Sequence, residues 1–287
     1  MSYTHTLVTT TSHLQDVLAF VARMATQQWP LAMALPGDLD WWRRADFIAP
    51  TPSHIQLWHC DHHLVAVLWP TDDQIDIIYD DAVPQLWSDI VAYCSQHHAP
   101  TCKLWTLSGQ QTRAHVLRQH GYRPQPTELL VHHQDTRWAP LHHPPAGIRI
   151  GAVTDALVDS RAAAQRDAFQ SAKMSPTIYQ HVRQLPSYTP AYDTVAINDA
   201  DEVVAFATVW VDWGSGTALF EPVGCRHAYQ RHGITKALIS NVLQQLHNAR
   251  IFRARVLSEA NPDNPAIRLY HRCGFITSAE LIPWQRV

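Results

Sequence analysis

One short segment occurs twice in this chain. Residues 115–122 read HVLRQHGY and residues 268–275 read RLYHRCGF, so each is a short helical pattern that ends at glycine and precedes an aromatic residue. Glycine is the usual residue where a helix ends in a left-handed conformation. The elements expected around the two segments follow one another in a similar order. The sequence therefore predicts a duplicated fold with two halves of similar plan.

Hydrophobic periodicity predicts helices and strands in both halves. In the first half we expect helices at 12–27, opened by a Ser12–Gln15 capping box, 84–97 and 110–120, and strands at 54–58, 64–69, 74–79, 101–107 and 128–133. In the second half we expect strands at 148–153, 194–198, 203–213, 217–223, 253–258 and 276–285, and helices at 154–170, 176–184, 233–247 and 265–272. This order predicts an α/β fold with a mixed sheet in each half.

The chain is long enough for two such units, because it has 287 residues of which 46% are apolar. Residues 136–147 contain three prolines and a glycine, a composition that prevents regular structure. We therefore expect a first domain over residues 1–135, a linker over 136–147 and a second domain over 148–287.

Charge and composition exclude several classes of protein. The formal net charge is −3, whereas proteins that bind nucleic acid or anionic membranes need a basic surface. The first residues form an amphipathic pattern rather than a signal peptide, and no apolar run is long enough to span a membrane. Five cysteines without a C-x-x-C pair predict reduced thiols and a cytoplasmic protein.

Histidine is abundant, but its spacing does not predict a metal site. The 19 histidines include adjacent pairs at 62–63, 97–98, 132–133 and 142–143. Adjacent side chains point apart on a helix or a strand, so such a pair is a poor chelate. We expect these histidines to be solvated loop and edge residues, and we expect no metal cofactor.

The stretch from residue 221 to residue 239, EPVGCRHAYQRHGITKALI, predicts an anion site. It leads through a loop into an amphipathic helix, whose first N–H groups and dipole attract phosphate. Gly233 allows a diphosphate to approach the backbone, and Arg226, Arg231 and Lys236 add positive charge. The two familiar glycine-rich phosphate loops, G-x-x-x-x-G-K-[ST] and G-x-G-x-x-G after a strand, do not occur. The alternative is an ordinary strand-to-helix turn with basic surface residues.

Two segments together resemble the GCN5-related N-acetyltransferase (GNAT) family. The acyl-CoA loop of that family, Arg/Gln-x-x-Gly-x-Gly/Ala, is similar to residues 230–235, QRHGIT, with Thr235 where glycine or alanine is usual. A later family motif, Asn-x-x-Ala-x-x-Leu-Tyr-x-x-x-Gly-Phe, resembles residues 263–275, with Asn264 shifted by one position. The strand before the loop looks like that of tandem-domain members. The resemblance covers residues 148–287 well and residues 1–135 only in outline.

The resemblance implies two tandem acyl-CoA N-acyltransferase-like domains, acetyl-CoA as co-substrate and an amine as acceptor. It implies that backbone groups of Val223 and Cys225 bind the pantetheine arm, that Asn264 contacts the cofactor nearby, and that Tyr270 lies near the sulfur. It assigns the rest of the cofactor site to the loop and the helix start: Gln230, Arg231, His232, Gly233, Ile234, Thr235 and Lys236. Since Thr235 is β-branched, it is expected to narrow the approach to the diphosphate.

The first half reads as a degenerate copy. No glycine occurs between Gly37 and Gly109, so the expected place of a phosphate loop has none. The position that corresponds to Gly233 falls beside Asp80 and Asp81, whose carboxylates would repel phosphate, and Leu117 stands at the position of Tyr270. We expect the first half to pack against the second and to shape its substrate site.

Direct attack on the acetyl thioester needs a neutral amine, so a base is expected. Glu221 is the candidate, with Glu259 and Asp212 in reserve, and a structural hydrogen bond is its alternative role. The resemblance makes Tyr270 the general acid. Because an unperturbed thiol is a stronger acid than tyrosine, a hydrogen bond to the developing thiolate is enough, and packing is the alternative role. Covalent catalysis by a cysteine lacks an identifiable base partner.

The acceptor is expected to be a small-molecule amine, partly apolar or sugar-like. Residues 168–192 should border its site, and they carry Tyr179, Tyr188 and Tyr192. No acidic trench is evident that would suit a polybasic peptide. The alternatives are a peptide or protein amine, an acyl donor other than CoA, and a non-catalytic acyl-CoA sensor. Nucleic acid and membrane are not expected as partners, and the chain is expected to be a monomer or a homodimer.

Overall fold

The computed structural model describes residues 3–8, 11–43, 55–71 and 73–286. The elements of the first half are β1 (Tyr3–Leu7), α1 (Thr11–Gln27), α2 (Pro36–Arg43), β2 (Gln56–Cys60), β3 (His63–Pro70), β4 (Gln74–Tyr79), α3 (Leu86–His97), β5 (Lys103–Leu107), α4 (Gln111–Gln119), β6 (Tyr122–Pro124) and β7 (Leu129–Asp135). The elements of the second half are β8 (Arg149–Ala152), α5 (Val158–Phe169), α6 (Pro176–Val182), β9 (Asp193–Ile197), β10 (Val203–Asp212), β11 (Thr217–Cys225), α7 (Ile234–Asn248), β12 (Arg253–Glu259), α8 (Pro265–Arg272) and β13 (Ile276–Arg286).

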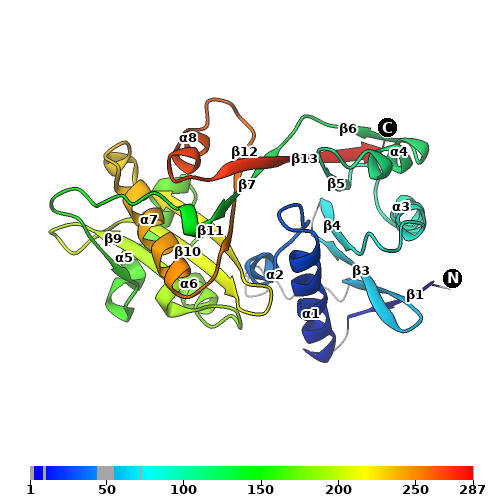
Figure 1. Cartoon of the computed structure of the whole chain (residues 1–287), viewed down its shortest axis with the longest axis horizontal. Helices are drawn as coiled ribbons and strands as arrows, with labels where there is room; N and C mark the ends of the chain where they lie inside the picture. The colour runs from blue at the N-terminus through cyan, green and yellow to red at the C-terminus, as the bar shows by residue number, and fades with distance from the viewer. Residues whose placement is uncertain (1–2, 9–10, 44–54, 72, 287) are drawn as a thin grey trace.

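All of these strands belong to one mixed sheet (Figure 1). Its order is β1-β2-β3-β4-β5-β13-β7-β12-β11-β10-β9-β8, and β6 pairs with β13 off this path. Most neighbouring strands are antiparallel, whereas β4 with β5 and β11 with β12 are parallel. The two parallel pairs stand at corresponding places in the two halves, which confirms the predicted repeat of a mixed α/β plan.

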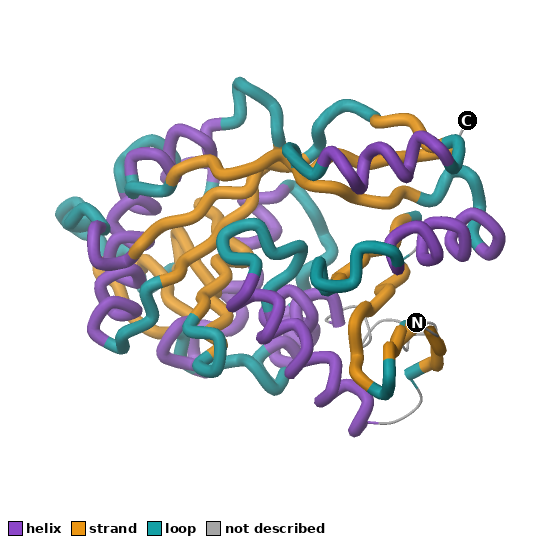
Figure 2. The backbone as a smooth tube through the Cα atoms, turned by 45° about the vertical axis from the view of Figure 1, so that its right-hand side comes forward, coloured by secondary structure: helices purple, strands orange, loops and turns teal. Residues whose placement is uncertain are grey.

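The two halves exchange strands at the middle of the sheet. β13 lies between β5 and β7, where Leu281 pairs with Leu107 on one side and Leu129 on the other. β7 pairs in turn with β12, where Arg255 lies opposite His133. Figure 1 shows β13 running from the second half into the first, and the continuous run of strands can be followed in Figure 2. The sheet therefore continues across the boundary expected at residue 135.

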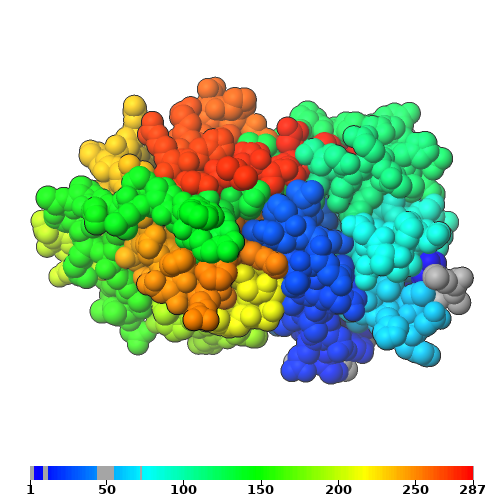
Figure 3. All heavy atoms as spheres, in the orientation of Figure 1, coloured from blue at the N-terminus to red at the C-terminus, as the bar shows by residue number. Residues whose placement is uncertain are grey.

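Different helices cover the two faces of the sheet. In the second half, α7 and α8 pack on one face, where Leu238 and Tyr270 join the same core as Phe220 and Val256. α5 and α6 pack on the other face, where Trp210 and Leu219 lie. α3 and α4 pack on the first half, and α1 packs on its strands through a separate core. The space-filling view shows the blue N-terminal residues lodged between the second half and the rest of the first half (Figure 3).

The sequence misses three elements, β1, α2 and β6. α2 is short and carries polar residues among its buried ones, so its apolar pattern is weak. β1 is an edge strand with mostly exposed side chains, and β6 has three residues. The expected helix at 154–170 is a 3-10 turn over Asp155–Leu157 followed by α5. The expected strand at 54–58 begins at Gln56 as β2, and residue 54 lies outside the described residues.

α2 lies on the second half because Gly37 lets it approach β10 closely. An ideal Cβ at Gly37 would overlap the Cβ of Trp210 and lie 3.1 Å from its Cγ. Gly37→Ala is therefore expected to destabilise the protein by about 1–3 kcal/mol in urea denaturation, because a well-packed contact would be overfilled. Gly151→Ala is the matched control, since nothing lies within 4 Å of a Cβ there. Equal effects of the two substitutions would contradict a tight contact at Gly37.

Candidate active site

β11 and β12 separate at the end of their shared ladder. Residues Thr217–Phe220 of β11 pair with Arg253–Val256 of β12. Beyond that point, Val223 and Cys225 pair only with β10, on the other side of β11, and the remainder of β12 pairs only with β7. The two strands thus form a wedge whose β11 side presents backbone groups. This is the arrangement expected for binding the pantetheine arm at Val223 and Cys225, and that assignment stays a prediction.

The loop after β11 turns sharply before α7 begins. Arg231 and Gly233 both have left-handed backbone conformations, with φ of 66° and 80°. The side chain of Gln230 donates to the carbonyl oxygen of Cys225 at 3.3 Å, which ties the loop back to the strand. An ideal Cβ at Gly233 has no atom within 4 Å, so the space in front of the helix start is open. Since the first amides of a helix have no partner inside it, this end can receive an anion.

Thr235 lies at the position where the family pattern has a smaller residue. Its hydroxyl hydrogen-bonds the thiol of Cys225, so the side chain is held against β11. Burial raises the pKa of the Cys225 thiol, and it raises the pKa of Cys273 to about 12. Both thiols therefore stay protonated at neutral pH, which weighs against the nucleophilic role considered for them.

Tyr270 projects from α8 into the core beneath the wedge. Only 6% of its surface is exposed, and its ring centroid lies 5.6 Å from that of His132 and 6.0 Å from that of Phe275. Burial raises the pKa of the Tyr270 phenol, and the negative charge of Glu221 raises it further. The two residues predicted to be catalytic therefore lie near enough to interact electrostatically. A phenol with a raised pKa keeps its proton and can donate a hydrogen bond.

Glu221 begins the part of β11 that leaves β12. Its carbonyl oxygen accepts a hydrogen bond of 2.6 Å from the indole nitrogen of Trp210. Phe220 and Val223 both pack against the core under α7 although they are three residues apart, because the pairing of β11 with β10 shifts register between them. Glu221 therefore lies at a β-bulge, next to the place where β11 leaves β12. Among the reserves, Asp212 accepts from the Ser215 amide at 2.6 Å and so stabilises a turn, and Glu259 is exposed on β12.

Asn264 has a structural role in addition to the one predicted for it. As the N-cap of α8, its side-chain oxygen accepts from the amide of Ala266 at 2.9 Å. Its side-chain nitrogen donates to the carbonyl oxygen of Glu259 at 3.4 Å, which joins the helix to the end of β12. Asn264 thus fixes the start of the helix that carries Tyr270. Its contact with the cofactor remains a prediction.

His132 is a residue of this site that the sequence assigned wrongly. It was expected in an exposed loop or edge, but it is completely buried on β7. Its Nε2 lies 2.9 Å from the hydroxyl oxygen of Ser258, and its Nδ1 lies 3.1 Å from that of Thr277. Burial, with help from His271, lowers the pKa of His132 to about 4, so the ring is neutral at pH 7. The strand exchange places β7 at the centre of the sheet, and no local pattern reveals that.

Comparison with known proteins assigns this geometry to a family. Residues 155–275 match the acetyltransferase (GNAT) family, and the wedge, the loop and Tyr270 all lie within that range. This part of the chain is a GNAT acetyltransferase domain. The protein is therefore an acyltransferase, as expected, and enzymes of this family use acetyl-CoA and act on amines. No curated protein sequence matches the chain.

Solved structures show that the fold of the whole chain recurs. The GCN5-related N-acetyltransferase from Sphaerobacter thermophilus has a TM-score of 0.66 at 17% identity, covering 99% of this chain and 95% of the other. A tandem GNAT protein from the clavulanic acid biosynthesis pathway has a TM-score of 0.64 at 14% identity, covering 99% and 98%. A GNAT-family acetyltransferase from Colwellia psychrerythraea has a TM-score of 0.66 at 8% identity, covering 99% and 100%. These likenesses establish the two-part acyltransferase fold.

The first half has a similar wedge, but side chains occupy its rim. β4 and β5 pair only at Gln74 with Lys103 and at Ile75 with Leu104. After β4, the carboxylate of Asp81 forms an ion pair with Arg113 of α4. The guanidinium carbon of Arg113 lies 4.8 Å from the ring centroid of Tyr79. A carboxylate and a stacked arginine thus stand where the GNAT domain has its open loop, which favours the degenerate copy expected from the sequence.

The tyrosines expected to border the acceptor site belong largely to a buried network. The phenols of Tyr179 and Tyr188 both donate to the carboxylate of Asp193, the second at 2.8 Å. Thr208 donates to the same carboxylate at 2.8 Å. Burial first, and then the charge of Asp193, raises the pKa of both tyrosines. This network holds α6 and the segment after it on the sheet of the GNAT domain.

Two further absences concern the described part of the chain. Within it, no group of three or more histidine, cysteine, aspartate or glutamate side chains is arranged to hold a metal ion. Among the same residues, no helix has the length and hydropathy that crossing a membrane requires.

Proposed function

We propose that the protein transfers the acetyl group of acetyl-CoA to the amine of a small molecule, by direct attack while both substrates are bound. The observation that carries this proposal is that β11 and β12 part directly after Phe220, and that Glu221 follows at this point and acts electrostatically on Tyr270 of α8.

The residues present suit acetyl-CoA, which supplies an activated acetyl thioester. The diphosphate is best placed at the amides from Arg231 to Lys236, because the space in front of Gly233 is open and Arg231 and His232 are exposed beside it. The β11 side of the wedge offers backbone donors and acceptors to an amide-containing arm. Thr235 hydrogen-bonds the thiol of Cys225 at the start of this approach, and the narrowing expected from its β-branched side chain stays a prediction.

The chain has two tasks in the reaction, and a residue is available for each. An amine with a pKa near 10 is neutral at pH 7 only at a cost of about 4 kcal/mol, so a group that accepts its proton accelerates attack. Glu221 is that group, and its carboxylate receives the proton directly or through water. The Tyr270 hydroxyl then donates a hydrogen bond to the departing sulfur, which stabilises negative charge as it develops. Since its pKa is raised, Tyr270 retains the proton as a donor.

Calorimetric titration of the full chain with acetyl-CoA tests the cofactor site. We expect one site per chain with a dissociation constant of about 1–100 µM, and far weaker binding of acetyl-pantetheine, which lacks the diphosphate. Two equal sites would contradict a degenerate first half. Absence of binding would reduce the loop to an ordinary turn and remove the basis of the proposal.

A further inference from the structure

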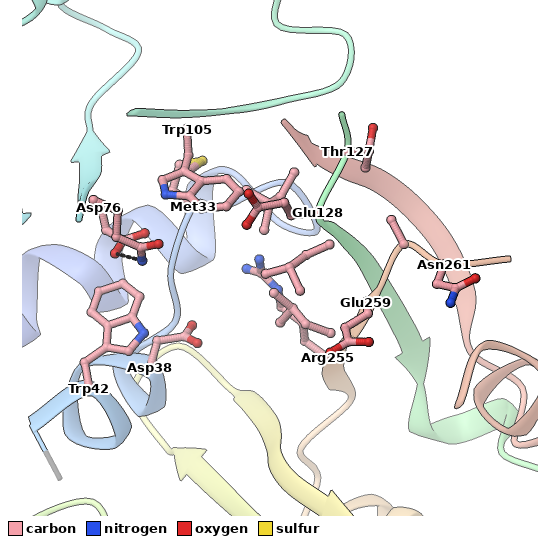
Figure 4. A pocket seen from close by; sticks show the side chains of 15 residues that line it. Met33, Asp38, Trp42, Asp76, Trp105, Thr127, Glu128, Arg255, Glu259 and Asn261 are labelled. Carbon is pink, nitrogen blue, oxygen red and sulfur yellow. Dashed lines mark hydrogen bonds between the residues drawn. The ribbon is translucent and has the colours of Figure 1, made fainter. Parts of the chain in front are cut away.

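A cavity of about 630 Å³ lies where the two halves meet, and residues of β4 and β12 are among those that line it (Figure 4). This volume is typical of a site for a small organic ligand. Its walls come from both halves: Met33, Asp38, Trp42, Gln74, Asp76, Trp105, Thr127, Glu128 and Leu129 from the first, and Arg255, Leu257, Glu259, Ala260, Asn261 and Leu281 from the second. The first half therefore contributes more than half of the lining.

The cavity reaches the mouth of the wedge. Val256 is the last residue of β12 that pairs with β11, and Leu257 and Glu259, which follow it, line the cavity. The carbonyl oxygen of Glu259 also accepts from Asn264, the residue expected near the pantetheine. One wall of the cavity is thus the strand along which the acetyl group would enter. Asp76, on β4, belongs to the opposite wall (Figure 4).

The lining is acidic, and part of its negative charge is not compensated. Asp38 interacts with the positive charge of Arg255, and Glu128 accepts from the ammonium group of Lys103 at 2.8 Å. Asp76 accepts from the neutral side-chain amide of Gln74 at 3.1 Å. Within the described residues, no cation lies at ion-pair distance from Asp76 or Glu259. Such a cavity attracts a positively charged ligand.

Arg255 provides a second observation, independent of the uncompensated carboxylates, that points to a ligand in this cavity. Only 1% of this side chain is exposed, and its guanidinium points from β12 toward α2 and the segment before it (Figure 4). One nitrogen donates to the carbonyl oxygen of Ala32 at 2.6 Å, whereas the Nε–H is buried without a partner among the described residues. A buried donor without a partner costs about 1–3 kcal/mol. The positive charge of Arg255 favours the ionised form of Asp38, which lines the cavity.

Burial and the neighbouring charge of Asp38 raise the pKa of Asp76 to about 7. An ammonium group bound beside Asp76 would lower that pKa again, because an opposite charge favours the ionised carboxylate. The indole rings of Trp42 and Trp105 provide apolar surface for the methylene groups of such a ligand, and they can also face a cation.

We propose that this cavity is the acceptor site, and that it selects a small molecule with at least two amino groups. One amine reacts at the wedge near Glu221, and the second, as ammonium, is held by Asp76 at the wall that the first half provides. This inference rests on the proposed function, and it gives the degenerate half a task, which is the recognition of the substrate end that does not react.

Matched amines test the proposal. With the full chain at pH 8, kcat/KM is measured for acetylation of diamines with three to six carbons, and for monoamines of the same length. Since a charge-assisted contact is worth a factor of about ten or more, the best diamine should exceed its monoamine by at least that factor. In the Asp76→Asn variant, the ratio of kcat/KM for the diamine to kcat/KM for the monoamine should fall close to one. Asp201→Asn, an exposed change of the same charge on the turn between β9 and β10, should keep the ratio.

Binding without turnover supplies the second measurement. The best diamine is titrated calorimetrically into the protein saturated with CoA, and Asp76→Asn should weaken its binding about tenfold. If monoamines and diamines are acetylated equally well, the proposed function stands and the two-amine site is wrong. If no amine is acetylated but acetyl-CoA and the diamine bind, the transferase proposal fails and the site survives. If Asp76→Asn leaves diamine binding unchanged, the assignment of Asp76 is overturned whatever the activity.

Discussion

Replacing Glu221 with glutamine is expected to lower kcat by about 100-fold or more, because general bases typically contribute that much. The substitution keeps the size of the side chain and the backbone contact with Trp210, so the fold should persist. The dissociation constant for acetyl-CoA should stay within about twofold, since the contacts predicted for the cofactor lie after Glu221, at Val223, Cys225 and the loop before α7. Steady-state kinetics and calorimetric titration of the same preparation separate the two effects.

The loss should depend on the basicity of the acceptor. An amine whose pKa lies below about 6 is already neutral at pH 7, so it has little need of a base, and Glu221→Gln should reduce its rate much less. Tyr270→Phe should reduce the rate for both kinds of amine alike, because a hydrogen bond to the sulfur is independent of the amine. Glu202→Gln, an exposed change on the turn before β10, is the matched control.

Two results would reassign the base. If Glu221→Gln keeps full activity while Glu259→Gln loses it, the carboxylate at the end of β12 accepts the proton. If the loss is the same for amines of high and low pKa, Glu221 acts by orienting the substrate or the strand rather than by taking a proton.

The duplicated plan and the acetyltransferase domain were accessible from the sequence because their signals are local. A glycine that ends a helix, a glycine before α7 and the pattern around Tyr270 each lie within a few consecutive residues. The structure confirms the left-handed conformation predicted at Gly121 and Gly274, and Gly233 has one as well. α8 has the predicted bounds, Pro265–Arg272.

The strand exchange was not accessible, because strand pairing depends on distant residues. β7 has only buried and partly buried side chains, β13 mixes buried, partly buried and exposed ones, and neither pattern states which neighbour the strand has. The wrong expectation that His132 is solvated has the same cause, because the neighbours of β7 were not predicted. On an edge strand it would be solvated, whereas between β12 and β13 it is enclosed by Ser258 and Thr277.

The acidic cavity was missed for the same reason. Asp38, Asp76 and Glu259 lie far apart in the sequence, on α2, β4 and β12, and each is a lone carboxylate in its own segment. The sequence therefore showed no acidic trench, although the folded chain gathers these groups at one place. α2 matters most here, because it carries Asp38 and its apolar pattern was too weak to predict it as a helix.

Asp76→Asn is expected to stabilise the protein at pH 8, by up to about 4 kcal/mol relative to the wild type. The pKa of Asp76 is about 7 in the folded protein and 3.8 in the reference state, so folding favours the protonated form. The stability that this group contributes is complete below pH 4 and is lost as pH rises to 7, at about 1.36 kcal/mol for each unit of pKa difference. Asparagine does not titrate, and its side-chain oxygen can still accept from Gln74.

The measurement is the free energy of unfolding in urea at pH values from 4.5 to 8.5, for both proteins. The difference should grow from the acid end to about pH 7 and stay constant above it. His132, whose pKa of about 4 is depressed, destabilises both proteins below pH 6.5 and so cancels in the difference. Asp201→Asn, a change of the same charge at an exposed position, is the matched control.

A flat difference for Asp76→Asn would mean that the Asp76 carboxylate is hydrated and has an ordinary pKa. The acidic cavity would then contain no carboxylate with a pKa near 7. A large difference would show that the chain keeps a carboxylate where it costs stability at neutral pH. Substitutions that remove such a cost arise readily, so a residue retained against it is usually held by function. Adding the best diamine at pH 8 tests whether Asp76 is retained because it binds a ligand. A ligand that binds the folded wild type through Asp76 must raise its stability more than that of Asp76→Asn, because binding to the folded state is linked to unfolding.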